Sequence, residues 1–380
     1  MTRREEEEEE KKQDPSQEKQ DFQDLFFQAI LGAQLIQTAY IGHRLGWYTA
    51  LKNAGNDGLS YQQLASSTHS SQRYAQEWLE QQAVAGWIQC RNPSAASPHE
   101  RMYVLPKEHA QVLANPDSLQ YSMPLAILHG GTGKRLEDLV HAYKHDTGVS
   151  WDELGTDARE AQAAMNRPFF LQQFAATLEQ CLDIDTLSKL SNGGGRVADI
   201  GCGYAYSSIG VAQHFGKNCT VHGYDLDEPS IIKARDNIQK EGLQDRVHVY
   251  CKDAASVITN DSFEPYDLVM ALECLHDMSN PISVLKTMKD LAGSHGTVLV
   301  MDERVADSFD EGIANPIEQL MYGFSCTCCL ADCKSHPNSA ETGTVMRPSI
   351  LTMYAQQAGF RQVEILPVET DLFYFYKLIQ

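Results

Sequence analysis

The chain has 380 residues, which exceeds the usual size of one domain, so we expect at least two domains. Hydrophobic residues make up 42% of the chain, and the formal net charge is −20 at pH 7. A chain with this charge repels nucleic-acid backbones and anionic membranes unless it carries a local basic patch, and the sequence has no such patch of useful size. We therefore expect neither nucleic acid nor a membrane among its partners.

The N-terminal sequence predicts where the protein resides. The chain begins without the charged and then apolar leader of a secreted protein, and no apolar stretch reaches the ~20 residues that a transmembrane helix needs. The ten cysteines are then expected to be reduced thiols in a cytoplasmic protein. Residues 1–20 include the run Glu5 to Glu10 and lack apolar periodicity, so they are predicted to form a disordered acidic tail.

Residues 21–110 are predicted to form a winged-helix domain. The apolar spacing predicts helices over 22–35, 40–51, 59–65 and 71–86, followed by short β runs at 87–90 and 102–105. Three helices followed by a β hairpin is the order of a winged helix. The apolar face of the first two helices would remain exposed on a lone domain, so we expect a homodimer through this region.

Residues 111–190 are predicted to be a helical linker with substrate-pocket helices, and residues 191–380 an α/β domain. Strands are predicted at 197–200, 220–224, 247–250, 266–272 and 296–301, with helices at 207–215, 229–241 and 282–291 between them. This alternation predicts a parallel sheet covered by helices. Two further strands, 362–366 and 372–378, are separated by a turn so short that they must be antiparallel.

The first β–α turn, Asp199-Ile-Gly201-Cys-Gly203, is typical of a nucleoside site. Glycines allow the backbone to approach a ligand closely at a helix N-terminus. A dinucleotide fingerprint would have Gly or Ala at position 206, where this chain has Tyr206. A carboxylate at Asp199 suits a cationic ligand, and S-adenosylmethionine (SAM) carries both an ammonium and a sulfonium group.

Acidic residues also follow the next two strands. Asp225 ends the second strand, where a carboxylate can accept both hydroxyls of a ribose, and Leu226 can pack against adenine. Asp253 and Ala254 follow the third strand, and Asp253 can accept a hydrogen bond from the adenine amino group. Each acid could instead cap a helix, but the three together indicate a cofactor site at the carboxyl edge of the sheet.

These motifs resemble those of the class I SAM-dependent methyltransferases. The resemblance rests on Val-Ala-Asp-Ile-Gly-Cys-Gly, Gly-Tyr-Asp-Leu-Asp and Tyr-Asp-Leu-Val-Met-Ala-Leu-Glu-Cys-Leu-His, and it covers most of residues 21–380. The predicted winged helix is similar to the dimerisation domain of small-molecule O-methyltransferases. The resemblance implies a Rossmann-like sheet with an antiparallel last strand, SAM as cofactor, and Glu273 as a further cofactor-binding residue. Ala205 departs from the family, which usually has a third glycine there.

The candidate catalytic residues are His276 and Asp302. His276 follows the fourth strand and resembles the histidine base of plant-type O-methyltransferases, while Asp302 at the end of the fifth strand matches the acid that orients it. A neutral imidazole can take the proton of an acceptor hydroxyl near pH 7. The alternative is that His276 caps a helix or binds backbone.

A second group of residues is open to two interpretations. The cysteines Cys326, Cys328, Cys329 and Cys333 lie near His336 and could bind zinc or a soft metalloid. Their spacing does not repeat a CxxC pair, so we predict no metal and interpret residues 321–330 as an apolar helix lining the substrate pocket. Arg347 could hold a substrate anion or a surface partner.

The function predicted from these features is methyl transfer from SAM to an oxygen or nitrogen of a small molecule, such as a natural product or modified peptide. Alternatives are a SAM-binding protein that does not methylate, a winged-helix regulator and a thiol-based arsenite methyltransferase. The recognition helix of a regulator would carry Arg73 together with Glu77 and Glu80, an unfavourable charge pattern for DNA. The sequence does not identify the acceptor.

Overall fold

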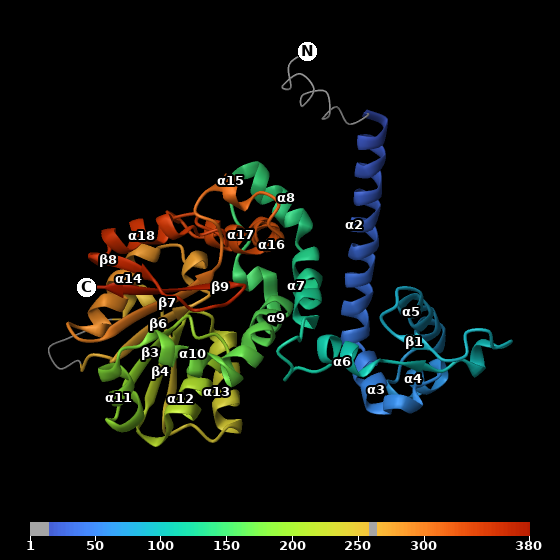
Figure 1. Cartoon of the computed structure of the whole chain (residues 1–380), viewed down its shortest axis with the longest axis horizontal. Helices are drawn as coiled ribbons and strands as arrows, with labels where there is room; N and C mark the ends of the chain where they lie inside the picture. The colour runs from blue at the N-terminus through green and yellow to red at the C-terminus, as the bar shows by residue number, and fades with distance from the viewer. Residues whose placement is uncertain (1–14, 258–263) are drawn as a thin grey trace, which may run out of the picture. The chain divides into compact units, whose positions relative to one another are not determined.

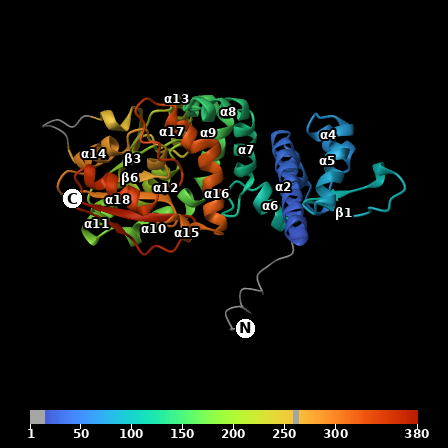
Figure 2. The same cartoon turned by 90° about the horizontal axis from the view of Figure 1, so that it is seen from above.

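The structure is a computed structural model, and it describes residues 15–257 and 264–380. By its internal contacts the chain divides into two compact units. The first contains the chain up to Asn115 together with Gln120–His129, and the second contains Pro116–Leu119 together with Gly130–Gln380. Figures 1 and 2 show the helices of the first unit in blue to teal and the sheet of the second in green to red.

The first unit begins with one long helix, α2 (Pro15–Arg44). This corrects two predictions, because residues 15–20 are helical rather than disordered, and the chain does not break between residues 35 and 40. The predicted tail over residues 1–14 lies outside the described residues. The helix ends where Gly46 takes a positive φ of 71°, after which α3 (Trp47–Ala54) begins.

Helix α2 exposes most of its apolar side chains. Phe22 is 66% exposed, Leu25 67% and Phe26 60%. By length and composition alone, Glu18–Arg44 could cross a membrane, which corrects the expectation that no stretch is long enough. The Gln and Gly residues within it interrupt the apolar run in the sequence without making the helix polar. One such helix near the N-terminus is weak evidence of a membrane segment.

The rest of the first unit is the predicted winged helix. It contains α3, α4 (Tyr61–Ser67), α5 (Gln72–Val84), the antiparallel strands β1 (Gln89–Cys90) and β2 (Tyr103–Val104), and α6 (Lys107–Leu113). Ser60 caps α4 in a capping box with Gln63, which fixes the start of that helix. Trp47 and Trp78 pack together in the core of this unit, with ring centroids 5.0 Å apart in an edge-to-face arrangement.

Several helices precede the sheet of the second unit. They are α7 (Met123–Gly133), which straddles the boundary between the two units, α8 (Leu136–His145), α9 (Trp151–Gln172), α10 (Phe174–Cys181) and α11 (Ile184–Asn192). Ser150 starts α9 through a capping box with Glu153. Gly155 interrupts the helical geometry of α9 with a φ of 78°, so the first turn of α9 is set apart from the rest of the helix.

The sheet of the second unit has seven strands in the order β5-β4-β3-β6-β7-β9-β8. Their bounds are β3 (Arg196–Ile200), β4 (Thr220–Asp225), β5 (Val247–Cys251), β6 (Leu268–Leu272), β7 (Thr297–Glu303), β8 (Gln362–Ile365) and β9 (Phe373–Ile379). Strands β3 to β7 pair in parallel, while β9 is antiparallel to both β7 and β8. The predicted Rossmann-like sheet with an antiparallel last strand is therefore confirmed.

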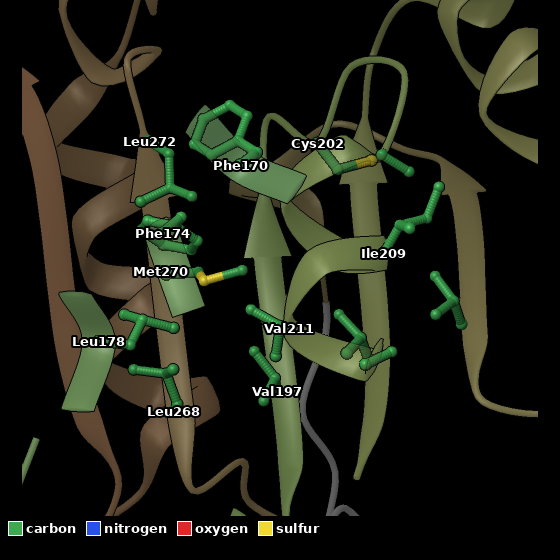
Figure 3. Packing of buried hydrophobic residues seen from close by; sticks show 14 of the residues in the cluster. Phe170, Phe174, Leu178, Val197, Cys202, Ile209, Val211, Leu268, Met270 and Leu272 are labelled. Atoms are coloured by element: carbon green, nitrogen blue, oxygen red, sulfur yellow. The ribbon is translucent and has the colours of Figure 1, made fainter. Parts of the chain in front are cut away.

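Helices cover both faces of this sheet (Figure 1). One face packs against α10, α12 (Tyr206–Phe215) and α13 (Glu228–Lys240), and the other against α14 (Pro281–Ala292) and α18 (Pro348–Gln357). Alternate residues of each strand point to opposite faces of the sheet: Val197 packs in the hydrophobic cluster on the first face and Ala198 in the cluster on the second. Figure 3 shows Phe174 of α10 beside Met270 of β6, and Leu178 of α10 near Leu268 of the same strand.

Candidate functional site

A cavity of about 650 Å³ lies in the second unit at the carboxyl ends of the parallel strands, within the size range of small-molecule sites. Three turns form one side, which we call the cofactor wall: residues 201–207 after β3, 224–227 after β4 and 252–255 after β5. The rest of the lining, which we call the acceptor wall, comes from the turn after β6 (272–280), from α9 and from α17 (Leu330–Lys334). Parallel strands place all these turns at one edge of the sheet.

The turn after β3 requires left-handed backbone geometry at several positions. Gly201 has a φ of +70°, and a Cβ there would lie 2.7 Å from Sγ of Cys274. Gly203 also has a positive φ and lines the cavity. Ala205, which precedes α12, has a φ of 63°, a geometry that costs an L-residue about 1–2 kcal/mol. The usual glycine at this position therefore has a physical reason, and this chain carries the strain instead.

Asp199 bonds to neighbouring side chains inside the protein and does not line the cavity. It is 1% exposed, and its Oδ2 accepts hydrogen bonds of 2.6 Å from the hydroxyls of both Ser207 and Ser208. Burial raises the pKa of Asp199 to about 6. Asp199 is absent from the residues that line the cavity, so the geometry gives it the role of tying α12 to β3, in place of the direct cofactor contact expected from the sequence.

Asp225 lines the cavity in the place expected of a ribose-binding residue. Its Oδ2 accepts a 2.8 Å hydrogen bond from the backbone N–H of Gly203, and its Oδ1 a 2.9 Å bond from that of Asp227. Each carboxylate oxygen can accept more than one hydrogen bond, so both retain capacity for a ligand hydroxyl. Burial raises the pKa of Asp225, and these backbone N–H groups oppose that rise.

The remaining predicted residues of the cofactor wall also line the cavity. Leu226 is 64% exposed, an apolar side chain available to a flat ligand. Asp253 accepts a 2.9 Å hydrogen bond from the backbone N–H of Ala255 and caps the short helix that starts at Ala254. The capping alternative raised by the sequence is thus realised for Asp253, although the residue still borders the cavity.

Glu273 lines the cavity just after β6 with a φ of 50°, an unfavourable backbone geometry for a non-glycine residue. Asn166 of α9 donates a hydrogen bond to its Oε2. Burial raises the pKa of Glu273 to about 8, so its carboxyl group is largely protonated at pH 7. Asn166 is 107 residues distant in sequence, and nothing near it pointed to this contact.

His276 and Asp302 are brought together as the sequence predicts. Nδ1 of His276 lies 2.6 Å from Oδ1 of Asp302, and the two residues are 2% and 1% exposed. Glu303, which sequence reasoning missed, places its Oε2 3.0 Å from the same Nδ1. Nε2 faces Oδ1 of Asp277 at 3.3 Å. A hydrogen bond from Nδ1–H to a carboxylate would leave Nε2, which faces Asp277, as the nitrogen that can take a proton.

The charge around His276 controls its protonation. Burial alone would lower the pKa of His276, but the carboxylates of Asp277, Asp302 and Glu303 together raise it well above its usual value. The imidazole is absent from the cavity-lining residues, whereas Asp277 is among them. The carboxylate of Asp277 therefore lies at the cavity surface, with the imidazole behind it.

An ion pair connects α9 to the cofactor wall. Arg159 is 7% exposed and bonds both carboxylate oxygens of Asp227, from Nε at 3.0 and 2.8 Å and from Nη2 at 2.7 Å. Its Nη2 also bonds Asp152 at 2.9 Å. Farther along the acceptor wall, the backbone N–H of Trp151 donates a 2.6 Å hydrogen bond to Oδ1 of Asp332. These contacts span up to 181 residues of sequence, so no local pattern revealed them.

The cysteine-rich segment differs from its prediction. It forms α16 (Pro316–Phe324), a π-helical turn (Ser325–Cys329) and α17, and residues 321–330 are absent from the cavity lining; Asp332 and His336, just beyond, are present. Within the described residues, the groups that could hold a metal include a single cysteine, Cys329 with His276 and Asp277, and a second set of His276, Asp302 and Glu303.

Arg347 also lies outside the cavity lining. It bonds Oε1 of Glu318 at 3.1 Å and the hydroxyl of Tyr322 at 3.0 Å. These contacts connect α16 to the start of α18, so the guanidinium group has protein partners and does not reach the cavity.

Comparisons with known proteins agree with this architecture. The family model "Methyltransferase domain" matches residues 191–353, and "Rv2258c-like winged HTH domain" matches residues 33–115. Methyltransferase GfsG of Streptomyces halstedii is 29% identical over 119 residues, which are 31% of this chain and 41% of that protein. The ubiquinone biosynthesis O-methyltransferase of Stutzerimonas stutzeri is 30% identical over 109 residues, 29% of this chain and 44% of that protein. The chain thus spans less than half the length of these curated relatives.

Solved structures match the chain over most of its length. The mitomycin 7-O-methyltransferase MmcR has a TM-score of 0.71 at 15% identity, covering 96% of this chain and 99% of MmcR. Human N-acetylserotonin methyltransferase in complex with SAM has a TM-score of 0.63 at 16% identity, covering 97% and 99%. At these identities the likeness concerns the fold. Together with the matched family models it confirms the resemblance seen in the sequence: the chain combines an N-terminal winged-helix domain with a methyltransferase domain of the Rossmann-like fold.

Proposed function

We propose that this chain transfers a methyl group from SAM to an oxygen or nitrogen of a small acceptor molecule, with oxygen favoured. The observation that carries the proposal is the convergence of three separate turns, with Gly203, Asp225 and Asp253, on one cavity beside the His276–Asp302 pair. Open sheets of this kind bind their ligands at the carboxyl ends of the strands, where these three turns lie. The similarity in fold to the mitomycin 7-O-methyltransferase MmcR supports a specialised metabolite as the acceptor.

The cofactor wall fits SAM in shape and donor chemistry. Asp225 retains acceptor capacity for the two ribose hydroxyls, Leu226 offers an apolar surface to adenine, and Asp253 lies at the next turn for the amino group. When bound, SAM supplies a methyl group that its sulfonium charge has already activated. What the protein must add is the position of the acceptor and, for a hydroxyl, the removal of its proton.

His276 is the proposed base. Its Nδ1 faces Asp302, which orients the ring and favours the imidazolium that forms when Nε2 takes a proton. The raised pKa makes the imidazole a strong base but also protonates it at neutral pH, so the active form becomes more abundant as the pH rises. Asp277, 3.3 Å from Nε2, lies between the imidazole and the cavity, where an acceptor hydroxyl must approach.

The proposal is tested by calorimetry with SAM, followed by incubation of the protein and labelled SAM with a metabolite extract. We expect binding of one SAM per chain and transfer of label to a small molecule. Binding without transfer to any extract component would favour the alternative of a SAM-binding protein that does not methylate. Absence of SAM binding would overturn the proposal.

A second candidate, a winged-helix regulator, has a named family match in its favour. Its recognition helix would be α5, where Arg73 forms an ion pair with Glu77. Paired in this way, the arginine offers less charge to a phosphate backbone. Fluorescence anisotropy with random duplex DNA at low salt would decide this candidate, and we expect no binding at micromolar protein.

We also propose that the chain forms a homodimer through α2. The support is the exposure of Phe22, Leu25 and Phe26, because a monomeric soluble protein rarely exposes a contiguous apolar face of this kind. A second copy would cover it by an isologous contact. Light scattering should give twice the chain mass for the unmodified protein and one chain mass for the double variant Phe22→Glu/Phe26→Glu.

The control for the dimer is Val84→Glu, which adds charge at an exposed apolar residue at the end of α5 and should leave the mass unchanged. A monomer for the unmodified protein would contradict the proposal. Flotation of the unmodified protein with lipid vesicles would also contradict it, since the lipid would then be the partner of α2.

A further inference from the structure

We propose that Arg159 is a positioning residue for SAM. Its guanidinium group holds the carboxylate of Asp227, and through Asp227 it fixes the turn after β4 that carries the ribose-binding carboxylate of Asp225. This inference rests on the proposed function and deepens it, because it concerns how the chain holds the cofactor of that reaction. The sequence around Arg159 gives no sign of this role, since the residue lies on α9, 68 residues before Asp227.

Arg159 and Asp227 form a largely buried ion pair with several hydrogen bonds. The side chain of Arg159 is 7% exposed and that of Asp227 is 14% exposed. Nε donates to both carboxylate oxygens, at 3.0 and 2.8 Å, and Nη2 donates to Oδ1 at 2.7 Å. The further bond of Nη2, to Asp152, reaches a carboxylate that is 88% exposed, and a pair in such a position contributes little. The guanidinium group is therefore committed mainly to Asp227.

Asp227 is the residue through which this pair acts on the cofactor wall. Its carboxylate caps α13 by accepting a 2.9 Å hydrogen bond from the backbone N–H of Ser230, and its own backbone N–H donates to Oδ1 of Asp225 at 2.9 Å. The orientation of the Asp225 carboxylate thus depends on where Asp227 lies. Burial, and to a smaller extent the charge of Asp227, raises the pKa of Asp225, so a cation beside Asp227 also favours the ionised form that accepts ribose hydroxyls.

Helix α9 is a fixed support for this contact. A Cβ at Gly210 of α12 would lie 2.2 Å from the backbone carbonyl oxygen of Phe170 of α9, so the two helices pack more closely there than any larger residue would allow. Phe170 itself belongs to the hydrophobic cluster on that face of the sheet. Arg159 lies on this anchored part of α9, after the break at Gly155. A helix of the acceptor wall therefore takes part in holding the cofactor.

The experiment measures the affinity of the full-length protein for S-adenosylhomocysteine by calorimetry at pH 7. Arg159→Met removes the guanidinium group and keeps a long side chain. Asp227→Asn removes the charge that the guanidinium group holds, and it keeps an oxygen that can cap α13. We expect each substitution to weaken binding about tenfold. The double variant should also lose about tenfold rather than about a hundredfold, because the two side chains act through one contact.

Two further variants separate the geometry of the contact from its charge. Arg159→Lys keeps the positive charge, but a compact ammonium group does not reproduce the fork of a guanidinium, so its affinity should fall between those of the unmodified protein and Arg159→Met. The matched control is Arg101→Met, which removes a guanidinium group that bonds Glu80 at 2.8 Å in the winged-helix unit and is absent from the lining of the described cavity. It should leave the affinity unchanged. Thermal unfolding without ligand shows which variants are folded before their affinities are compared.

Two results would overturn the inference. The first is an affinity within about twofold of the unmodified protein for Arg159→Met, or for Arg159→Lys if the methionine variant does not fold. The second is a loss in the double variant equal to the product of the two single losses, since Arg159 and Asp227 would then act on the cofactor independently. Both results differ from a failure of the proposed function, in which the unmodified protein itself binds neither SAM nor S-adenosylhomocysteine.

Discussion

The two walls of the cavity are built in different ways. Each turn of the cofactor wall directly follows a parallel strand, so Gly203, Asp225 and Asp253 occupy positions that the strand ends fix. The acceptor wall is assembled from α9, the turn after β6 and α17, and its contact between Trp151 and Asp332 joins residues 181 positions apart. The cofactor wall is thus a property of local sequence, whereas the acceptor wall depends on how distant helices pack.

The walls also differ in how their acids are satisfied. Asp225 and Asp253 accept hydrogen bonds from backbone N–H groups, and these bonds exist before any ligand arrives. On the acceptor wall burial raises the pKa values of Asp277 and Asp332, while the charge of His276 opposes the rise for Asp277 and the backbone N–H of Trp151 opposes it for Asp332. The acids of the cofactor wall are thus held by backbone groups near them in the sequence or the sheet, whereas Asp332 depends on a backbone group 181 residues away.

The largest expected effect tests the acceptor side. His276→Ala should lower the turnover of a hydroxyl acceptor by about 10²–10⁴-fold, because a positioned base contributes this much, while SAM affinity stays unchanged. Initial rates with labelled SAM and calorimetry measure the two effects. His295→Ala, at an exposed residue, is the control. Turnover within a few-fold of the unmodified protein would assign His276 a structural role.

The next effect tests the cofactor side. Asp225→Ala should weaken SAM binding by about 1–3 kcal/mol, or about 5–150-fold in affinity, because it removes acceptors for the ribose hydroxyls. Asp245→Ala removes an exposed carboxylate beyond α13 and should leave the affinity unchanged. If calorimetry gives the same affinity for Asp225→Ala and the unmodified protein, the ribose assignment fails.

A pH profile tests the acceptor wall and the cofactor wall separately, without any mutation. Only neutral imidazole accepts a proton, and the pKa of His276 is raised, so turnover of a hydroxyl acceptor should increase about tenfold per pH unit until that pKa is passed. The inflection should lie above pH 6.5. SAM affinity, measured in parallel, should change less over the same range. An inflection below pH 6.5 would contradict the charge environment assigned to His276.

The smallest effect concerns backbone strain in the cofactor wall. Ala205→Gly should raise the free energy of unfolding by up to about 1 kcal/mol, since glycine adopts a φ of 63° without the steric cost that alanine incurs. Ala176→Gly, at an exposed position inside α10, should have the opposite sign and cost about 0.5–1 kcal/mol. Urea denaturation measures both; because Ala205 is fully buried, the lost methyl group opposes the gain, and an Ala205→Gly variant destabilised as much as Ala176→Gly would contradict the strain.

Sequence patterns predicted the fold well where they were strongly periodic. The alternating strands and helices after residue 195 appear in the structure, including the antiparallel pair β8 and β9. The errors lie where periodicity is ambiguous: α2 runs without a break from Pro15 to Arg44, and the helix predicted over 40–51 is divided between α2 and α3. Helix ends are set by a few backbone geometries, such as the positive φ of Gly46, which composition does not reveal.

In the candidate site, too, local motifs predicted some residues, whereas contacts between distant segments were missed. Of the eight cofactor-binding residues predicted from local motifs, seven line the cavity and Asp199 does not, because two serines of the following helix bond its carboxylate. They also predicted the pairing of His276 with Asp302. They did not predict Arg159, Glu303 or Asp332, because the partners of these residues come from other parts of the chain.

The sequence by itself therefore determined the order of strands and helices and the three turns that end the first three parallel strands, because both depend on spacing within a few residues. Only the tertiary structure decided which carboxyl groups face the cavity, which are buried behind it and which repel each other. Those properties follow from packing between segments more than a hundred residues apart, as the contact of Trp151 with Asp332 and that of Asn166 with Glu273 illustrate. The resulting low solvent exposure then sets the charge on each group.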